Sequence, residues 1–556
     1  MGWFRASQES DMTRALDALM SALAILIGVL LLTGGAHFTG PEFKVEISQV
    51  DAFALALFAL ALTRHRLAGG YFPEAILACS RRGLEILERK PGAVLAGAIA
   101  AYVILQTGVS AWRFASFHAN AYDLSYLDQP IWSTFRVGFL HSSLAVNQTY
   151  LGEHFAPAIA LFAPVYRVWD SVYALFFVQS LILGGSAWLL YRLALALGVR
   201  APAPILLSLC FLLYQPLRAA NTFDFREDNL FVPVFLGALL ALATARTTVF
   251  WLLCAFSWFV KENAALFTAL LGAWACLAPR SLRPAGTAGV RPRRLRFHGA
   301  VLFVSSLAVF CLVNQELTPI FSGGSGKTRF AFRMGAMAQS GTGLFAFALE
   351  HPFDFFAYLA KQFLNASTLK YFLIVFTPFL FFARSAPIPF LIALAGFAMN
   401  VVLGIHSVGF HYECVIIPFL FYSLALALSR QRSRALGSAP AACILLSFLF
   451  FYGRSPVHDL RAFVPGAHHR MVSEELQKIP REASVATQSA LHPHLTHRKD
   501  AFLLAGPPTA DYVAVDLSEG IDRYGTPNLL QDVAAMDSAS YDKVVDRDGL
   551  IIWKKR

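Results

Sequence analysis

Long apolar runs separated by short polar segments dominate this chain and limit what it can fold into. A helix of about 20 apolar residues crosses the hydrocarbon core of a bilayer, and shorter helices cross where they are buried among others. Only 15% of the 556 residues are charged and 56% are hydrophobic, whereas a soluble chain carries about 25% charged residues. The sequence therefore predicts an all-α polytopic membrane protein with a small hydrophilic segment at its C-terminal end.

Thirteen runs are candidate membrane spans. They are residues 16–36, 47–63, 92–110, 172–191, 202–218, 230–246, 248–260, 263–278, 299–318, 369–384, 387–404, 412–428 and 440–453. Basic residues concentrate in four connecting segments, 64–91, 192–200, 280–296 and 430–434. Short basic loops stay on the cytoplasmic side. Placing all four there predicts about 13 crossings, with a cytoplasmic N-terminus and a periplasmic C-terminal segment.

This orientation settles two ambiguous runs. Residues 154–169 contain Pro157, Pro164 and Arg167, and a crossing here would invert the later loops. We therefore expect them to lie as a helix at the outer interface. Residues 248–278 must cross twice, with "KEN" at the outer turn.

The net charge of +11 and the seven cysteines indicate no further function beyond the membrane topology. Most of the surplus positive charge sits in the basic loops, so we expect no nucleic-acid partner. The seven cysteines lie mostly within apolar runs and form no C-x-x-C pair, and they predict no disulfide framework.

Three parts follow from these patterns. Residues 1–91 are expected to form a transmembrane hairpin and a cytoplasmic amphipathic segment, and residues 92–453 the main transmembrane domain with its outer loops. Residues 454–556 carry an amphipathic helix pattern, "HHRMVSEELQKIP", and short strand patterns such as "DYVAVDL". They predict a small periplasmic α/β domain that ends in a hairpin turning at Arg547-Asp548-Gly549.

The predicted topology places the polar clusters of the chain on one face, the periplasmic one. The clusters are "NAYDLSYLDQ", "GEHF", "NTFDFREDN", "KEN", "EHPFDFF" and "GIHSVGFHYE". Ionisable residues beside a membrane are costly and usually face a cavity and pair with one another. These segments are therefore the candidate functional site.

Asp123 and Asp128 are the candidate catalytic residues. On a helix a spacing of five residues separates them by about 140°, so they do not share a face. Asp123 is nearer the preceding span and is the expected general base, because a carboxylate at a low-dielectric interface has a raised pKa unless a cation holds it ionised. The alternative is helix capping and pairing with Arg113 or Arg136.

Eight further residues are candidates for substrate binding. They are Glu153, His154, Asp224, Arg226, Glu227, Lys261, Glu262 and His411. The cationic members suit a phosphate, and the acids of the 224–228 loop suit a divalent cation. The alternatives are a solvated turn around Arg226, an internal pair of Lys261 with Glu262, and a helix-start role for His154. We read "LHPHLTHR" as a surface histidine cluster rather than a metal site.

The ordered segments carry a resemblance to a known family. "AYDLSYLDQPIWSTFRVG", "LGEHFAP", "FDFREDN", "VKENAAL" and "ASVATQSALHPHLTHR…DYVAVDL" resemble a bacterial family of polytopic membrane proteins of unassigned function, over roughly residues 100–550. That family is distantly similar to the GT-C superfamily of membrane glycosyltransferases, which includes protein O-mannosyltransferases and lipid A aminoarabinose transferases. Two predicted spans precede the superfamily's usual first one.

The resemblance implies a GT-C-type glycosyltransferase of the bacterial inner membrane. It would transfer a sugar from a polyprenyl-phosphate donor to an acceptor on the periplasmic face. Asp123 lies where the superfamily has its catalytic acid, and His154 of "H-x-x-P" where a basic residue meets the carrier phosphate. "DL" follows Tyr122 in place of the frequent "DE", which leaves dependence on Mg²⁺ or Mn²⁺ open. The identities of the sugar and of the acceptor are open as well. The alternatives are a transporter or flippase of lipid-linked or anionic solutes and a non-catalytic assembly protein.

Overall fold

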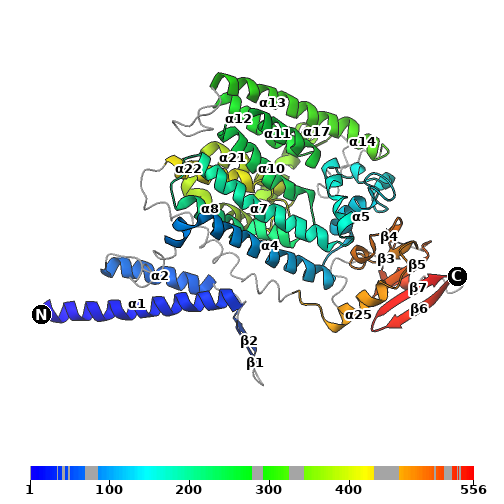
Figure 1. The fold of residues 1–556 in the computed structure, drawn as a ribbon, viewed down its shortest axis with the longest axis horizontal. Coiled ribbons are helices and arrows are strands. Elements are labelled where there is room, and N and C mark those ends of the chain that lie inside the picture. Colours follow the sequence, from blue (N-terminus) through cyan, green and yellow to red (C-terminus); the bar gives the residue numbers. More distant parts are fainter. Residues whose placement is uncertain are drawn as a thin grey trace.

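Helices make up most of this computed structural model (Figure 1). The structure describes residues 2–33, 36–39, 44–47, 51–68, 85–278, 292–324, 343–430, 463–505, 509–518, 529–534, 536 and 540–556. Its α-helices of ten residues or more are α1 (Gly2–Thr33), α2 (Asp51–Ala68), α4 (Pro91–Ala115), α7 (Tyr173–Ala196), α8 (Ala203–Leu213), α10 (Phe231–Ala243), α11 (Thr247–Val260), α12 (Ala264–Leu277), α13 (Pro292–Leu312), α18 (Pro352–Phe363), α19 (Ala366–Phe376), α21 (Pro387–Val402), α22 (Ile417–Arg430) and α25 (Ala467–Leu476).

Shorter helical segments connect these helices. They are η1 (Ala121–Ser125), α5 (Tyr126–Ser133), η2 (Val146–Gln148), η3 (Tyr150–Gly152), η4 (Pro157–Phe162), α6 (Val165–Val168), α9 (Gln215–Thr222), η5 (Glu227–Leu230), η7 (Val313–Leu317), α14 (Thr318–Phe321), α17 (Gly343–Glu350), η8 (Thr377–Phe379), α20 (Leu380–Ala383), η11 (His492–Leu495) and α26 (Leu529–Ala534). A two-stranded antiparallel hairpin, β1 (Ala36–Thr39) and β2 (Lys44–Ile47), lies between α1 and α2, where the sequence had predicted no strand.

Four described helical stretches are long and apolar enough to cross a membrane. They are Asp11–Leu30, Pro91–Ala115, Tyr173–Ala196 and Pro292–Phe321. Helices α8 and α9, at the predicted span 202–218, are long and apolar enough only when taken together, and they meet at a bend of 44°. Pro216 in the first turn of α9 cannot donate a backbone hydrogen bond, so the α8 ladder does not continue through it. The remaining apolar helices of the described chain are shorter, and the predicted span 440–453 lies outside the described residues.

The run 154–169 does not form one helix, contrary to the expectation from sequence. It folds as two short segments, η4 and α6, neither of which is long enough to cross a bilayer. Pro157 begins the first segment and Pro164 separates the two, because neither residue has an N–H to continue a helical ladder. The run 248–278 forms two helices, α11 and α12, with Lys261 between them as predicted.

The main hydrophobic core lies among α4, α7, α8, α10, α12, α21 and α22. Every residue of α22 from Ile417 to Leu428 is buried, as expected for a helix that is apolar on all sides. Helices α12 and α13 lie close together at Gly272 and Gly299, where an added Cβ would come within 2.7 Å of the opposite backbone. Small residues permit this kind of contact between membrane helices.

A five-stranded sheet forms the C-terminal part of the molecule. Its strands are β3 (Val485–Thr487), β4 (Ala501–Leu503), β5 (Tyr512–Asp516), β6 (Tyr541–Arg547) and β7 (Leu550–Lys555), in the order β4-β3-β5-β7-β6. The first three are parallel, and β7 pairs antiparallel with both β5 and β6. Asp548 and Gly549 have φ values of 48° and 88°, which confirms the predicted tight hairpin turn.

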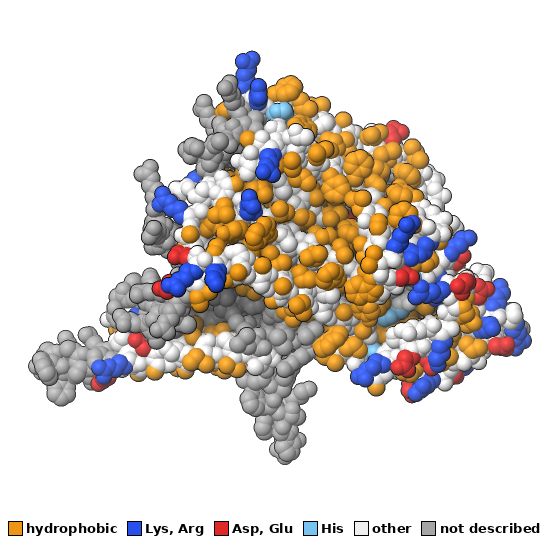
Figure 2. Space-filling model, in the orientation of Figure 1, with side chains coloured by type: hydrophobic (Ala, Val, Ile, Leu, Met, Phe, Trp, Pro, Cys, Tyr) orange, Lys and Arg blue, Asp and Glu red, His pale blue; other side chains and the backbone are white. Residues whose placement is uncertain are grey.

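The sheet lies at one end of the helical bundle, beside α5 and the C-terminal end of α4 (Figure 1). Figure 2 shows hydrophobic side chains over the middle of the molecule and charged groups of both signs over the C-terminal sheet. A broad apolar surface with charge at one end is the pattern of a membrane domain that carries a hydrophilic part.

Candidate functional site

The polar segments singled out in the sequence meet at one end of the helical bundle. They are the loop after α4, the turns around η3, the segment between α9 and α10, the turn between α11 and α12, and the loop between α21 and α22. Ion pairs and hydrogen bonds link these five segments into one network. The "EHPFDFF" segment is the exception, because His351 and Asp354 are exposed at the start of α18.

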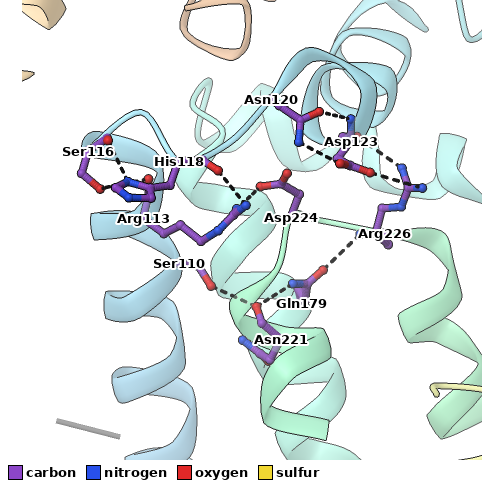
Figure 3. Close-up of polar contacts among 10 residues, drawn as sticks. All are labelled: Ser110, Arg113, Ser116, His118, Asn120, Asp123, Gln179, Asn221, Asp224 and Arg226. Carbon is purple, nitrogen blue, oxygen red and sulfur yellow. Dashed lines mark hydrogen bonds and ion pairs between the residues drawn. The ribbon is translucent and has the colours of Figure 1, made fainter. Parts of the chain in front are cut away.

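Asp123 lies on the π-helical turn η1, in the segment that follows α4 (Figure 3). The side chain of Asn120 stabilises this turn through two hydrogen bonds to Asp123. Its Oδ1 accepts a hydrogen bond from the Asp123 amide at 3.0 Å, and its Nδ2 donates to Asp123 Oδ2 at 2.8 Å. The Asp123 side chain is 26% exposed. Single π-helical turns occur frequently at functional sites.

Arg226 is the cation that faces Asp123 (Figure 3). Its Nη2 lies 3.8 Å from Asp123 Oδ1, and its Nη1 donates to the Asp123 carbonyl oxygen at 3.4 Å. Both contacts are longer than a good charge-assisted hydrogen bond of about 2.7–2.9 Å. The buried Nε has no hydrogen-bond partner among the described residues. The guanidinium therefore has hydrogen-bonding capacity that an anionic ligand would use.

The backbone of Arg226 is fixed by polar residues that point inward from the helices. Gln179 on α7 accepts from the Arg226 amide at 3.2 Å and donates to the Asn221 carbonyl at 2.9 Å. Ser110 on α4 donates to the same carbonyl at 3.0 Å (Figure 3). A glutamine and a serine inside apolar helices thus act as positioning residues for the loop.

Arg113 ties the loop after α4 to the loop before α10. It forms a buried ion pair with Asp224, and its Nη2 donates to the His118 carbonyl at 2.7 Å. Burial raises the pKa of Asp224 to about 6, against the opposing effect of Arg113. The structure places Asp224 as a support for the segments that carry Asp123 and Arg226, rather than at an exposed surface.

Lys261 pairs with two acids, neither of which is its neighbour in sequence. Its Nζ lies 2.9 Å from Glu227 Oε1 and 2.6 Å from Asp228 Oδ2, and Tyr150 donates to the same Glu227 oxygen at 3.1 Å. Burial alone would raise the pKa of Glu227, but Lys261 and Arg226 outweigh it and hold the value well below its ordinary range. The internal pair of Lys261 with Glu262 that the sequence suggested is replaced by this triad.

His154 and His411 complete the network. Nδ1 of His154 lies 2.8 Å from Glu262 Oε1, which joins the "GEHF" segment to the "KEN" turn. Nε2 of His411 lies 3.5 Å from Asp228 Oδ2, and neither of its ring nitrogens has a hydrogen-bond partner among the described residues. Burial, together with Arg226 and Lys261, lowers the pKa of His411 well below its usual range, so the ring is neutral.

Glu153 contacts the backbone of the preceding loop. Its Oε1 accepts from the backbone amide of Val146 at 3.5 Å.

The described residues do not assemble a metal site. No group of three His, Cys, Asp or Glu side chains within them is placed to hold an ion. The acids that the sequence offered as ligands face cations instead, since Asp224 pairs with Arg113, and Glu227 and Asp228 pair with Lys261.

Asp128 lies apart from this network, fully buried against the C-terminal part. It accepts short hydrogen bonds from Tyr166 and Thr496, and His497 Nε2 lies 3.3 Å away. The other ring nitrogen of His497 lies 3.1 Å from Asp170 Oδ1. Arg113 pairs with Asp224, and Arg136 lies 3.7 Å from Asp170, so the pairings that the sequence suggested for the two aspartates are replaced.

The histidines of "LHPHLTHR" are not a surface cluster, which corrects the sequence-based expectation. His492 is fully buried, and the ring of His494 stacks between Phe114 and Phe117 with centroid distances of 4.0 and 4.1 Å. The same segment contacts the candidate site directly, because the Ser489 carbonyl accepts from the amide of Ala121 at 3.1 Å. The C-terminal part therefore helps to hold the turn that carries Asp123.

Sequence reasoning missed the positioning residues. Asn120, Gln179 and Ser110 gave only a weak signal, namely single polar residues within or beside apolar helices. Tyr150 gave none, because its contact with Glu227 joins positions 77 residues apart.

Two solved structures of ArnT from Cupriavidus metallidurans are similar to this chain. The structure described as bound to undecaprenyl phosphate has a TM-score of 0.49 and 13% sequence identity, and covers 83% of this chain and 98% of its own. The apo structure has a TM-score of 0.46 and 12% identity, with 83% and 97% covered. No curated protein matches the sequence.

A family profile covers most of the chain. The profile described as a predicted membrane protein family, DUF2079, matches residues 113–552, which include the network around Asp123 and most of the C-terminal sheet. The chain therefore belongs to the DUF2079 family of predicted membrane proteins.

Proposed function

We propose that this chain is a membrane glycosyltransferase that moves a sugar from a polyprenyl-phosphate donor to an acceptor at the membrane surface. The observation that carries the proposal is the pairing of a partly exposed carboxylate, Asp123, with a buried guanidinium, Arg226, whose hydrogen-bonding capacity is incompletely used. A base that faces solvent beside a fixed cation suits attack on a sugar that leaves an anion behind.

In the proposed reaction, Asp123 accepts the proton of an acceptor hydroxyl or amine. The acceptor atom forms a bond to the anomeric carbon of the sugar while the bond from that carbon to the phosphate oxygen breaks. Polyprenyl phosphate leaves with the negative charge, which the Arg226 guanidinium stabilises. Lys261 and His154 sit in the same network, and they keep the acids behind Arg226 charged and in place.

The loose contact between Asp123 and Arg226 fits this division of roles. A donor phosphate would take the guanidinium in a closer, bidentate contact than the 3.8 Å pair that Asp123 makes with it. Asp123 would then be released from its cation and would be free to accept the proton of the acceptor. Binding of the donor thereby prepares the base.

The exposed ring of Tyr122 lies beside Asp123 and stacks on Tyr126 with a centroid distance of 6.2 Å. An exposed aromatic face next to the base is a suitable platform for the apolar face of a sugar ring. We assign this position to the acceptor or to the sugar in transfer.

The distribution of buried charge favours an enzyme over a transporter. The buried charged side chains of the described helical bundle lie at the end that carries Asp123. Arg218 lies about one helical turn further into the bundle, on α9. An alternating-access transporter needs a site near the midplane that both sides reach. We place the site on the periplasmic face of the bacterial inner membrane, from the positive-inside pattern.

The test uses the full-length protein in lipid nanodiscs. It is incubated with a panel of undecaprenyl-phosphate-linked sugars, with and without extracted cell-envelope glycolipids and glycans as acceptors, and free undecaprenyl phosphate is measured. We expect acceptor-dependent release from at least one donor. Movement of the lipid-linked sugar across a liposome bilayer without any release would support the transporter instead.

A further inference from the structure

A groove at the end of the bundle away from Asp123 belongs to neither the candidate site nor the C-terminal contact. It has a volume of about 430 Å³ and lies between α7, α10 and α11. Apolar side chains line most of it, including Leu189, Leu253 and Phe256. Val249, which also lines the groove, is 42% exposed, and Leu252 on the same helix is 65% exposed. This side of the bundle therefore presents the apolar surface that membrane helices turn toward lipid.

Two arginines stand at this groove. Arg192 lies near the C-terminal end of α7, and Arg246 immediately precedes α11; both line the groove and both are exposed. Neither guanidinium has a hydrogen-bond or ion-pair partner within the part of the chain that the structure describes. An apolar groove with two unpaired cations at the end of its helices is complementary to one kind of molecule, an amphiphile with an anionic head.

The groove and the candidate site lie at opposite ends of the same helices. Helix α10 begins three residues after Asp228 and ends three residues before Arg246. Its 13 residues span about 20 Å at 1.5 Å per residue. The groove is therefore too far from Asp123 to hold the reacting phosphate of a donor at that site, and a ligand here has a role other than that of substrate.

We infer that the groove formed by α7, α10 and α11 binds an anionic phospholipid of the bulk membrane, with its phosphate at Arg192 and Arg246 and an acyl chain along Leu189, Leu253 and Phe256. Arg192 lies on α7 and Arg246 on the turn between α10 and α11, so a shared phosphate would link α7 to that turn. Arginine forms this contact well because its planar fork matches phosphate oxygens.

The inference is tested by native mass spectrometry of the purified full-length protein. The protein is mixed with equal amounts of phosphatidylglycerol and phosphatidylcholine that carry the same acyl chains, and the retained lipids are counted. We expect wild-type protein to retain phosphatidylglycerol several-fold more than phosphatidylcholine, and the double variant Arg192→Gln/Arg246→Gln to lose this preference. Arg200→Gln is the matched control, because Arg200 is an exposed arginine in the same basic segment but does not line the groove.

A second variant tests the apolar groove independently of the two arginines. A Cβ at Gly237 would lie 3.1 Å from Leu253 Cδ1, so Gly237→Leu fills the groove and leaves both arginines in place. It is expected to reduce retained phosphatidylglycerol as well, with the melting temperature measured to show that the variant is folded. The inference would be overturned if the wild-type protein retained the two lipids equally. It would also be overturned if Arg200→Gln lost the preference for phosphatidylglycerol as fully as the double variant, or if the double variant kept that preference. Displacement of phosphatidylglycerol by an equimolar amount of undecaprenyl phosphate would overturn the choice of a bulk phospholipid.

Discussion

At the scale of single residues, the proposed reaction divides the network into groups that meet substrate and groups that hold them. Asp123 and Arg226 are the two that the proposal places against substrate. Lys261 is different, because Glu227 and Asp228 already surround its ammonium group. The two cations are expected to respond differently to substitution, and this difference checks the assignment.

Arg226→Lys is expected to weaken binding of the donor while the protein stays folded. The lysine keeps the positive charge next to Asp123 but cannot form a two-point contact with phosphate. Loss of one charge-assisted hydrogen bond of about 1.5 kcal/mol corresponds to an affinity about tenfold lower. Binding of undecaprenyl phosphate to protein in nanodiscs measures this change. Arg167→Lys is the control, since Arg167 lies over the Phe135 ring on the exposed side of α6; an equal effect in both variants would contradict the role of Arg226.

Lys261→Met is expected to lower the thermal stability of the protein more than its affinity for the donor. The substitution leaves Glu227 and Asp228 buried without their cation, and removing one partner from such a group costs about 3–5 kcal/mol. Thermal unfolding in detergent should show a much lower melting temperature than for Lys370→Met, which removes an exposed lysine. An unchanged melting temperature together with lost donor binding would instead make Lys261 a direct phosphate ligand.

At the scale of elements, one of the contacts between the C-terminal part and the helical bundle depends on the charge of a histidine. Burial alone would lower the pKa of His497, but the carboxylates of Asp128 and Asp170 outweigh it and raise the value to about 9. Burial also raises the pKa of Tyr166 well above its ordinary value, so this partner stays neutral. His497 is therefore positively charged at pH 7 and bridges two acids.

The pH dependence of this contact follows from the raised pKa of His497. A histidine with a raised folded-state pKa contributes stability that is complete below its unfolded value of about 6.5 and is lost as the pH rises through about 9. Limited proteolysis should release the C-terminal part faster at pH 9.5 than at pH 7. In His497→Gln the rate should already be high at pH 7 and should change little over this window. A flat profile in the wild type would contradict the contact.

The close packing of α12 against α13 gives a second prediction at this scale. An added methyl group at Gly272 would come within 2.7 Å of the backbone of α13, so Gly272→Ala must push the helices apart. Overpacking of this kind costs about 1–3 kcal/mol. Gly97→Ala is the control, because nothing lies within 4 Å of a Cβ at that position. Melting temperatures in detergent compare the two, and equal values would show that the helices do not touch there.

At the scale of the whole molecule, the sequence predicted the helical membrane class and the small C-terminal sheet because both depend on local patterns. Apolar runs and the Asp548-Gly549 turn are readable from neighbouring residues. Sequence spacing also separated Asp123 from Asp128, and the structure shows one partly exposed and the other fully buried.

The rest depended on contacts between distant parts of the chain. Asp128 meets Thr496 across 368 residues, and Lys261 meets Asp228 across 33. No local pattern in the sequence identifies such distant partners. The segment with His492, His494 and His497 was therefore predicted to lie at the surface, although it packs against the end of the helical bundle. The break at Tyr214 between α8 and α9 was missed because the apolar run continues through it, even though Pro216 follows.

The central claim is that Asp123 is the base of a sugar transfer, and release of undecaprenyl phosphate from a lipid-linked sugar donor tests it most directly. A general base contributes about 10²- to 10⁴-fold to the rate. We predict that Asp123→Asn lowers acceptor-dependent release by at least 100-fold while donor binding is retained. Asp354→Asn, which removes an exposed acid outside the network, should leave release unchanged. Release by Asp123→Asn at the wild-type rate would contradict the account.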